Sequence, residues 1–453
     1  MESKELYKIY EQHPVITTDS RECPEGSIFL ALKGASFDGN KFAVSALEKG
    51  CAVAIVDDQQ ICIDNPQLVE EGRLVFVDDT LQAFKDMARE HRRKFLIPVI
   101  AITGTNGKTT TKELIRAVLA EKYNVLATEG NFNNDVGVPK TLFRLNDEHE
   151  IAIIEMGASH PGDIKTLVET VEPTTGLITN VGRAHLQGFG SFEGVKRTKG
   201  ELYDFLASTG AIDNFVVNAD DADLVEMAEQ RFGVSVSQVI GTPYSLNPDE
   251  KRAYVIGNVI ACDPYLRFTW RMGYFKADET PVYEVTTHLI GSYNVYNALA
   301  AIVLGIRFGV SSEQICHAIE NYIPSNNRSQ LTITQHNKLI VDAYNANPTS
   351  MMAALKNFRD MQVENKMAIL GDMRELGADS AKEHAKIIDF IESANIKDVW
   401  LVGEEFGKTN CAFRKFHDVE EVKKEIAQSR PEGRCILIKG SNSIHLSQLP
   451  ELL

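Results

Sequence analysis

A glycine-rich loop between an apolar strand and a helix constrains this chain of 453 residues more than any other feature. The loop reads Thr103-Gly104-Thr105-Asn106-Gly107-Lys108-Thr109-Thr110. It follows the β-branched run Val99–Thr103, which is typical of a buried parallel strand. Apolar residues then recur at helical spacing from Leu114 to Leu119. A strand, a glycine-rich turn and a helix start indicate a phosphate-binding loop.

The chemistry of this loop suits ATP. Glycines let backbone N–H groups approach phosphate oxygens, and the helix N-terminus favours negative charge. Lys108 can neutralise the β- and γ-phosphates, and the Thr109 hydroxyl can bind Mg²⁺. The pattern GxxxxGK[ST] is incomplete because Ile102 stands at the first glycine position. The alternative is an ordinary glycine-rich turn, but the Lys-Thr pair and both flanks favour the binding of a nucleotide, which the resemblance described below implies to be ATP, by Gly104, Thr105, Asn106, Gly107, Lys108, Thr109 and Thr110.

A carboxylate ends the next long apolar strand. The segment IAIIEMG places Glu155 after four apolar residues. The carboxyl ends of parallel strands meet at one edge of a sheet, so this acid is well placed to bind a metal beside the phosphate loop. The alternative is an incidental acid at the surface.

Alternating apolar runs and helical patterns predict an α/β protein with parallel sheets. Between 252 and 287 strand follows strand, and Leu266, Phe268 and Trp270 alternate with polar residues as in an antiparallel sheet with one wet face. A single core stops growing at ~250–300 residues. We therefore predict three domains: residues 1–97, a central domain over 98–325 with an antiparallel side sheet, and a smaller Rossmann-like α/β domain over 326–453.

Composition limits the partners. The 63 Asp and Glu against 47 Lys and Arg give a net charge of −16, which argues against general binding to nucleic acid or membrane surfaces. There is no apolar run of ~18 residues, so we expect no membrane insertion. The polar start MESKELYKIYEQ and seven scattered cysteines favour a cytoplasmic protein with buried, reduced thiols. No oligomeric interface is legible, and we expect a monomer.

Further motifs run in order along the whole chain. They are TDSR (Thr18–Arg21), FLALKGASFDG (Phe29–Gly39), NFNNDVGVP (Asn131–Pro139), EMGAS (Glu155–Ser159), AHLQGFGS (Ala184–Ser191), KGELY (Lys199–Tyr203), GSYNVYNALAA (Gly291–Ala301), NNR (Asn326–Arg328), DAYNANP (Asp342–Pro348), GDMRELG (Gly371–Gly377) and KGS (Lys439–Ser441). With the phosphate loop, they resemble the Mur ligase family, whose members form amide bonds with ATP in peptidoglycan synthesis. NFNNDVGVP and GDMRELG are most similar to the member that adds D-alanyl-D-alanine to UDP-N-acetylmuramoyl-tripeptide.

The resemblance implies how substrates bind. The first domain is similar to the family's uridine-nucleotide module, in which Ser20, Arg21 and Lys33 would contact UDP. Further substrate-binding residues implied are Asn133, Asn134, Ser159, Asn345 and Lys439. Two positions depart from the family pattern: Asn40 stands where histidine is frequent, and Asn442 where arginine is frequent.

Four residues beyond the loop are implied as ATP contacts. Asn294 and Asn297 lie three apart at the start of an apolar helix, and amides can pair with an adenine edge. Their alternative is capping by Asn294 with Asn297 exposed. Arg328 would bind phosphates, with an inter-domain salt bridge as its alternative. Asp342 would lie near the ribose.

The resemblance also implies two Mg²⁺ ions and an unusual ligand. His185 would join Glu155 and Thr109 in metal binding, although a lone loop histidine is more often only hydrogen-bonded. Lys199, at a position that periodicity assigns to an exposed basic turn, would be carbamylated by CO₂ and become an anionic metal ligand. That reaction needs a neutral amine, hence a desolvated lysine with a lowered pKa. The implied catalytic residues are Lys108, His185 and Lys199.

The implied reaction passes through an acyl phosphate on the substrate carboxylate, which the amine of D-alanyl-D-alanine then attacks. Other readings remain open. They are another amino-acid ligase of the family, a folylpolyglutamate synthase-like enzyme, a regulatory ATPase and a nucleotide-binding scaffold without ligase activity.

Overall fold

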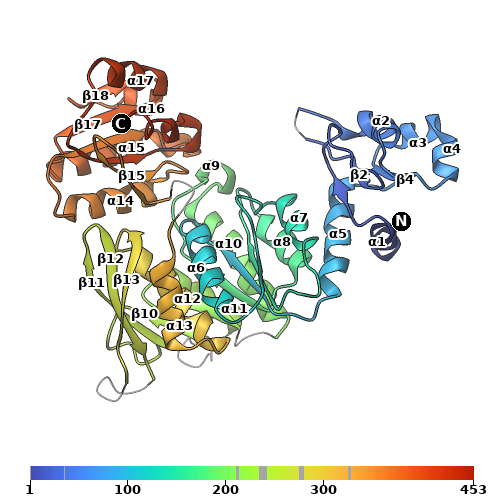
Figure 1. The fold of residues 1–453 in the computed structure, drawn as a ribbon, viewed down its shortest axis with the longest axis horizontal. Helices are drawn as coiled ribbons and strands as arrows, with labels where there is room; N and C mark the ends of the chain where they lie inside the picture. Colours follow the sequence, from blue (N-terminus) through green and yellow to red (C-terminus); the bar gives the residue numbers. More distant parts are fainter. Residues whose placement is uncertain (1, 35, 211–213, 234–241, 275–279, 325–327) are drawn as a thin grey trace. The chain divides into compact units, whose positions relative to one another are not determined.

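The computed structural model describes residues 2–34, 36–210, 214–233, 242–274, 280–324 and 328–453. They form two compact units. The first comprises Met1–Ala101, Leu126–Met156 and Lys165–Pro173, and the second comprises Ile102–Val125, Gly157–Ile164 and Thr174–Leu453. The expected boundary at 325/326 and part of the NNR motif lie outside the described residues. The expected boundary at 97/98 lies within them and, like the other, stays a prediction. Figure 1 shows the elements along the chain.

The first unit begins with a parallel four-stranded sheet in the order β1-β2-β3-β4. Its strands are β1 (Ile16–Thr17), β2 (Ile28–Leu30), β3 (Val53–Val56) and β4 (Leu74–Phe76). The helices and turns of this part are α1 (Ser3–Gln12), η1 (Gly39–Phe42), α2 (Ala43–Glu48), α3 (Gln59–Asp64), α4 (Pro66–Glu70) and α5 (Thr80–Arg93). Alternate residues of β2 enter different cores: Ile28 and Leu30 pack with α1, whereas Phe29 packs with α2. The sheet is thus buried on both faces, as its apolar runs predict.

Strand β5 (Val99–Thr103) leads from the first unit into the second. In the first unit, the backbone N–H of Ala152 in β7 (Ile151–Glu155) donates to Pro98, just before β5, at 3.0 Å. In the second unit, Thr179 donates to the carbonyl of Thr103 at 2.9 Å. The side chains on both faces of β5 are completely buried, which explains why its sequence is apolar without interruption.

The sheet continues through the second unit as β5-β8-β9-β10-β11-β12-β13. Its strands are β8 (Thr175–Ile178), β9 (Phe215–Asn218), β10 (Thr242–Ser245), β11 (Val255–Cys262), β12 (Tyr265–Met272) and β13 (Tyr283–Ile290). Pairing is parallel as far as β11 and antiparallel from β11 to β13. Leu266, Phe268 and Trp270 are at most 1% exposed and Arg267 is exposed, so the predicted one-sided side sheet is confirmed.

The remaining elements of this middle stretch are mostly helices. They are α6 (Lys108–Ala120), β6 (Val125–Ala127), α7 (Gly137–Leu142), α8 (Asp163–Val171), α9 (Leu186–Phe189), α10 (Phe192–Ser208), α11 (Ala222–Phe232), α12 (Asn294–Arg307) and α13 (Ser312–Asn321). Helix α12 is buried on nearly all sides, as its apolar sequence requires.

The last part of the second unit is a separate six-stranded sheet, β14-β15-β19-β16-β17-β18. Its elements are β14 (Gln330–Ile333), β15 (Lys338–Asp342), α14 (Pro348–Asp360), β16 (Lys366–Gly371), η2 (Gly377–Asp379), α15 (Ser380–Ser393), β17 (Asp398–Val402), α16 (Glu404–Gly407), β18 (Arg414–Phe416), α17 (Val419–Gln428), β19 (Cys435–Lys439), η3 (Asn442–Ile444) and η4 (Leu446–Gln448). Strands β15, β19 and β16 are parallel neighbours, and DAYNANP, KGS and GDMRELG extend from their carboxyl ends. Three motifs therefore meet at one sheet edge.

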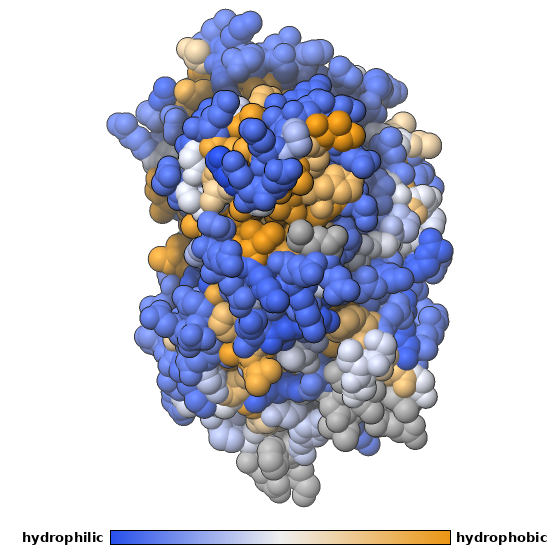
Figure 2. Space-filling view, turned by 90° about the vertical axis from the view of Figure 1, so that its right-hand side faces the viewer, coloured by the Kyte–Doolittle hydropathy of each residue, from blue (hydrophilic) through white to orange (hydrophobic). Residues whose placement is uncertain are grey.

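The surface agrees with the composition. The face drawn in Figure 2 is mainly hydrophilic, with apolar side chains gathered in its upper half. Among the described residues, no helix is both long and apolar enough to cross a membrane. All seven cysteines are free thiols in this structure. Only Cys51 and Cys435 are buried, so the expectation of buried thiols is wrong for the other five.

A buried histidine ties helices of the first unit together. The side chain of His91 in α5 lies 2.9 Å from the hydroxyl of Tyr7 and 3.0 Å from the carbonyl of Leu145. Tyr10 and Phe143 pack around its ring. Because a carbonyl only accepts hydrogen bonds, Nε2 carries the proton and Nδ1 accepts from the tyrosine. Burial lowers the pKa of His91 below its ordinary value.

This burial predicts an acid-sensitive contribution to stability. As the pH falls below about 6.5, the unfolded His91 binds a proton that the folded form resists, so the free energy of unfolding falls. His91→Gln should cost about 1–3 kcal/mol near neutral pH and should flatten the decline in the free energy of unfolding below about pH 6.5. Urea unfolding followed by circular dichroism measures both effects. His160→Gln, at a side chain that is 71% exposed, should keep the original slope; an unchanged slope in His91→Gln would contradict the assignment.

Candidate functional site

The glycines of the phosphate loop are required by its conformation. Gly104 has φ +142° and Gly107 has φ +78°. A Cβ atom at Gly104 would lie 2.0 Å from the hydroxyl oxygen of Thr179, and one at Gly107 would lie 2.8 Å from Oδ1 of Asn297. Both the backbone angles and the close neighbours exclude larger residues. The loop is therefore a tight strand-to-helix turn, with Gly107 preceding α6.

Residues after β8 hold this loop in place. The side-chain oxygen of Asn180 accepts from the N–H of Asn106 at 3.0 Å, and its carbonyl accepts from the N–H of Thr105 at 3.0 Å. The Thr179 hydroxyl donates to the carbonyl of Asn106 at 2.6 Å. These supporting residues were not identified from the sequence, where TN after GLI carries no distinctive pattern.

Lys108 folds back over the loop. Its ammonium donates to the carbonyls of Gly104 at 2.8 Å and Thr105 at 3.1 Å. Thr109, the next residue of α6, is 5% exposed. A cation held above a glycine-rich turn is the arrangement that phosphate binding needs.

Asn297 packs against the phosphate loop, and neither Asn294 nor Asn297 caps a helix. The N-cap of α12 is Tyr293, and both asparagines are buried, so capping with an exposed Asn297 is wrong. Asn297 accepts from the hydroxyl of Thr111 at 3.0 Å and donates to Asn294 at 2.8 Å. Asn294 in turn donates to the carbonyl of Ile290 at 2.8 Å. Adenine contact by these amides stays a prediction.

Lys199 is buried in the middle of α10. It is 2% exposed, so the alternative of an exposed basic turn is wrong. Burial, reinforced by the positive charge of Lys108, lowers the pKa of Lys199 well below its ordinary value. By contrast Lys196, one turn earlier, pairs with Asp223 at 2.9 Å and Glu226 at 2.7 Å, which raises its pKa. The neutral amine that CO₂ requires is therefore favoured at Lys199 and disfavoured at Lys196.

His185 lies close to Lys108, at the start of α6, and to Lys199, in α10. Its backbone is left-handed, with φ +50°, immediately before α9. Its ring packs edge-on against Phe189, whose own ring has the Lys199 ammonium 5.6 Å from its centroid. Burial is the main cause that lowers the pKa of His185; Lys108 and Lys199 lower it further, whereas its ion pair with Glu375 opposes the shift.

In the first unit, Glu155 is a buried carboxylate at the end of β7. It is 1% exposed, so the surface-acid alternative is wrong. The Thr128 hydroxyl accepts from its N–H at 2.9 Å, and the Asn133 amide donates to its Oε1 at 2.9 Å. Asn134 instead accepts from the N–H of Gly137 at 2.8 Å and so shapes the start of α7.

The residues expected to bind UDP form two small groups in the first unit. Arg21, whose side chain is 86% exposed, pairs with Asp19 at 2.6 Å. The carbonyl of neighbouring Ser20 accepts from the ammonium of Lys49 at 2.7 Å. Lys33 pairs with Asp57 at 2.8 Å.

Asn40, one of the two departures from the family pattern, has a local function. It is 1% exposed, donates to Asp57 at 2.7 Å and accepts from the Asp57 N–H at 3.0 Å. Asp57 therefore organises both Asn40 and Lys33, a role that the sequence did not indicate.

At the edge of the last sheet, Lys439 joins two neighbouring motifs. Its ammonium, which is 1% exposed, donates to Asp342 at 2.5 Å and to the carbonyl of Asn345 at 3.2 Å. Arg328 stacks on the ring of Tyr344 at 3.9 Å. Predicted residues from two strands are thus brought together around Asp342.

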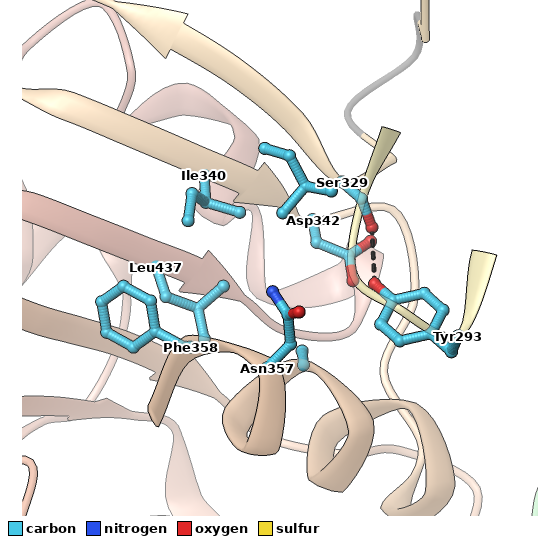
Figure 3. A pocket seen from close by; sticks show the side chains of 9 residues that line it. Tyr293, Ser329, Ile340, Asp342, Asn357, Phe358 and Leu437 are labelled. Atoms are coloured by element: carbon cyan, nitrogen blue, oxygen red, sulfur yellow. Dashed lines mark hydrogen bonds between the residues drawn. The ribbon is translucent and has the colours of Figure 1, made fainter. Parts of the chain in front are cut away.

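A small pocket opens beside Asp342. Figure 3 shows Asp342 from β15 and Tyr293 from the start of α12 at one end of it, with Ile340, Phe358 and Leu437 along the apolar wall. The hydroxyl groups of Tyr293 and Ser329 lie 2.9 Å apart. Burial, assisted by the nearby Asp342, raises the pKa of Tyr293.

Two asparagines connect the phosphate loop with the motif DAYNANP. Asn347 donates to Oδ1 of Asn106 at 2.7 Å, and Asn106 donates back at 3.4 Å. Asn347 is also the N-cap of α14. The sequence indicated the neighbouring Asn345, but Asn345 hydrogen-bonds locally with Ala346 at 2.8 Å. Similarly, Ser159 donates from its backbone to Asp163 at 2.8 Å.

Each expected metal ligand, taken within its own unit, has a chemistry that suits Mg²⁺. This ion prefers oxygen ligands, which the Glu155 carboxylate offers in the first unit and the Thr109 hydroxyl offers in the second. His185 offers a nitrogen, and Lys199 would offer oxygen once carbamylated, for which its burial is suitable. Among the described residues, no three His, Cys, Asp or Glu side chains gather as a metal cluster.

Three family models match successive parts of the chain. The Mur ligase family catalytic domain matches residues 14–92, the Mur ligase middle domain 102–305, and the Mur ligase glutamate ligase domain 327–442. An Escherichia coli relative is 33% identical over 97% of this chain and 93% of its own length. The chain therefore belongs to the Mur ligase family, and the resemblance seen in its motifs is confirmed.

The relatives share one description. The E. coli protein and a Bacillus subtilis protein, 31% identical over 97% of this chain and 93% of its own length, are both named UDP-N-acetylmuramoyl-tripeptide--D-alanyl-D-alanine ligase. Among solved structures, MurF from Acinetobacter baumannii is 27% identical, with a TM-score of 0.83 over 99% of this chain and 97% of that one. The predicted three-domain α/β architecture is confirmed, and the chain is a ligase.

The close neighbours of Gly104 predict the effect of one added methyl group. The added Cβ of Gly104→Ala would clash with Thr179. The positive φ of this position would also be strained in alanine. We expect the dissociation constant of ATP to rise about tenfold or more, equivalent to about 1.4 kcal/mol. Calorimetric titration with ATP measures this effect. Gly407→Ala has no atom within 4 Å of the new Cβ and should bind ATP normally; normal binding by both variants would contradict the role of this loop.

Proposed function

We propose that this chain adds D-alanyl-D-alanine to UDP-N-acetylmuramoyl-tripeptide, with cleavage of ATP to ADP and phosphate, as a monomer in the cytoplasm. The observation that carries this proposal is similarity over nearly the whole chain to relatives that bear this one name. The tight phosphate loop and buried Lys199 support it, because they are features of a phosphoryl-transfer site rather than of a passive scaffold.

The chemistry follows from the weakness of a carboxylate as an electrophile. The terminal carboxylate of the tripeptide attacks the γ-phosphorus of ATP, ADP leaves, and an acyl phosphate forms. The amine of D-alanyl-D-alanine attacks the acyl carbon, loses a proton, and inorganic phosphate leaves from the tetrahedral intermediate. One carboxylate oxygen therefore ends in the released phosphate. Such a reaction needs positioning and charge neutralisation more than a protein nucleophile.

The residues of the phosphate loop would supply most of that positioning. Backbone N–H groups from Gly104 to Thr110 would bind phosphate oxygens, and Lys108 would exchange its loop carbonyls for the β- and γ-phosphates. Arg328 would add a planar donor fork, and Asp342 would accept from the ribose. Asn294 and Asn297 would bind adenine by exchanging hydrogen bonds that they now make with each other.

The proposed metal ligands are Thr109, Glu155, His185 and carbamylated Lys199. Mg²⁺ bound by them would neutralise charge that develops on the transferring phosphoryl group. Lys199 would attack CO₂ through its neutral amine and lose a proton, giving a carbamate whose charge is opposite to that of an ammonium. The desolvated surroundings of Lys199 support this assignment, because they disfavour the charged amine.

Residues of both units would bind the parts of the substrates other than ATP. Ser20, Arg21 and Lys33 would contact the UDP group. Asn133, Asn134, Ser159, Asn345 and Lys439 would line the muramoyl-peptide and dipeptide sites. The Asn106–Asn347 pair supports a role for DAYNANP in excluding water from the acyl phosphate, because that motif contacts the phosphate loop directly.

Substrate dependence and isotope transfer test the reaction. Phosphate release should require ATP, UDP-N-acetylmuramoyl-tripeptide and D-alanyl-D-alanine together, with the amide product seen by mass spectrometry. ¹⁸O from a labelled tripeptide carboxylate should appear in the phosphate, because that oxygen bridges carbon and phosphorus in the intermediate. Product formation only with a single amino acid would assign another Mur ligase activity. Phosphate release from ATP alone would assign an ATPase.

Chemical rescue tests the role of Lys199. Lys199→Ala should lose at least about 100-fold in turnover, and added short carboxylic acids should restore part of it by replacing the carbamate. Lys196→Ala is the matched control, because Lys196 lies one turn away and is ion-paired, so it should keep its turnover. Steady-state phosphate release measures both variants. Full activity of Lys199→Ala without any added acid would remove this residue from the mechanism.

A further inference from the structure

The loop that follows β16 docks onto the segment that carries His185. The carboxylate of Glu375 accepts from Nδ1 of His185, and the carbonyl of Glu375 accepts from the N–H of Gln187 at 3.4 Å. A Cβ at Gly377 would lie 3.7 Å from the Cβ of Gln187, in ordinary contact. In Figure 1, α9, which follows His185, lies next to the C-terminal part of the same unit.

The docked loop is held from within its own sheet. Glu375 has a left-handed backbone with φ +63°. On its N-terminal side, the N–H of Met373 donates to Nε2 of His384 at 3.1 Å, and the N–H of Arg374 donates to the Ser441 hydroxyl at 3.0 Å. The loop therefore presents Glu375 in a defined place.

Those supports are themselves buried and hydrogen-bonded. His384 is completely buried, and its Nδ1 donates to the carbonyl of Ser380 at 2.8 Å. The carboxylate of Asp372, also completely buried, accepts from the N–H groups of Glu405 at 3.0 Å and Phe406 at 2.9 Å. None of these groups has a part in the proposed reaction, and their hydrogen bonds hold the loop and its neighbour α16 in place.

The pairing determines which nitrogen of His185 can bind a ligand. A carboxylate only accepts hydrogen bonds, so Nδ1 of His185 carries the proton and Nε2 keeps its lone pair. Histidines that bind metals commonly donate their other N–H to a carboxylate in this way, which fixes the tautomer and the ring orientation.

We propose that Glu375 is a positioning residue, whose carboxylate fixes the Nδ1–H tautomer of His185 and directs Nε2 to the metal. The assignment of the tautomer stands on the contacts of the loop alone, whereas the identity of the ligand at Nε2 rests on the proposed function. The histidine would then be ready to bind a metal only when the loop of residues 371–377 is docked. A loop of the C-terminal sheet would thereby determine whether His185, which follows β8 of the large sheet, can bind the metal.

The rival explanation is an ordinary surface ion pair. Glu375 is 59% exposed, and exposed pairs contribute only ~0–1 kcal/mol. Three features favour positioning instead: the His185 side chain is only 30% exposed, the two backbones are also hydrogen-bonded, and the loop is anchored by buried groups. A role through orientation does not require a large contribution to stability.

Nuclear magnetic resonance of the full chain with ¹⁵N-labelled histidine tests the tautomer directly, without metal or nucleotide. His185→Gln identifies the signals of His185. In the unaltered chain at pH 8, the proton should be on Nδ1. Glu375→Ala should shift the population several-fold toward Nε2–H, whereas Glu375→Gln, which keeps an acceptor oxygen, should retain Nδ1–H. Glu392→Ala removes an exposed carboxylate of α15 and should change nothing. An unchanged tautomer in Glu375→Ala would overturn the proposal.

Binding of Mn²⁺ in the presence of ADP, followed by electron paramagnetic resonance, separates the two proposals. Glu375→Ala should weaken Mn²⁺ binding about 10-fold or more, Glu375→Gln should weaken it less, and Glu392→Ala should not. If His185→Gln loses Mn²⁺ but Glu375→Ala keeps both Mn²⁺ and the tautomer, positioning by Glu375 is wrong and the metal role of His185 stands. If His185→Gln binds Mn²⁺ normally, the metal role of His185 is wrong, and the tautomer alone decides the role of Glu375.

Discussion

The close packing of the phosphate loop against the residues after β8 is the constraint on which the site in the second unit depends. Gly104 has no space for a side chain beside Thr179, and Asn180 binds the loop through both its side chain and its backbone. Since Lys108 begins α6 directly after this turn, its ammonium is positioned by the same contacts. The loop in turn contacts Asn297 and Asn347, which belong to α12 and to the start of α14.

Burial gives the neighbouring titratable groups their character. Lys196 and Lys199 are one turn apart on α10, yet their pKa values shift in opposite directions, because one is surrounded by carboxylates and the other by apolar atoms and Lys108. The same desolvation keeps the pKa of His185 low despite its partner Glu375. A helix of ordinary composition thus carries two lysines with different chemistry.

The sequence predicted the parts of the fold whose signals are local. Long apolar runs became β5 and β7, and alternation predicted the face of β12. The two-residue strand β1 and the three-residue strand β18 were missed because each is too short to show a period. The exposure of Lys199 was wrongly read from its charged neighbours, since burial depends on what packs over α10. Asn180, Asn347, Asp57 and Glu375 were missed because each acts on a residue far away in sequence.

The position of β19 has a consequence for how the molecule is completed. This strand follows β15 to β18 in the sequence, yet it lies between β15 and β16, and it ends in Lys439, which donates to Asp342. During synthesis on the ribosome, β15 and β16 emerge before β19, so the strand that pairs with both of them is still missing. The C-terminal sheet therefore closes only after β19 has been made, and before that Asp342 lacks the cation that it binds.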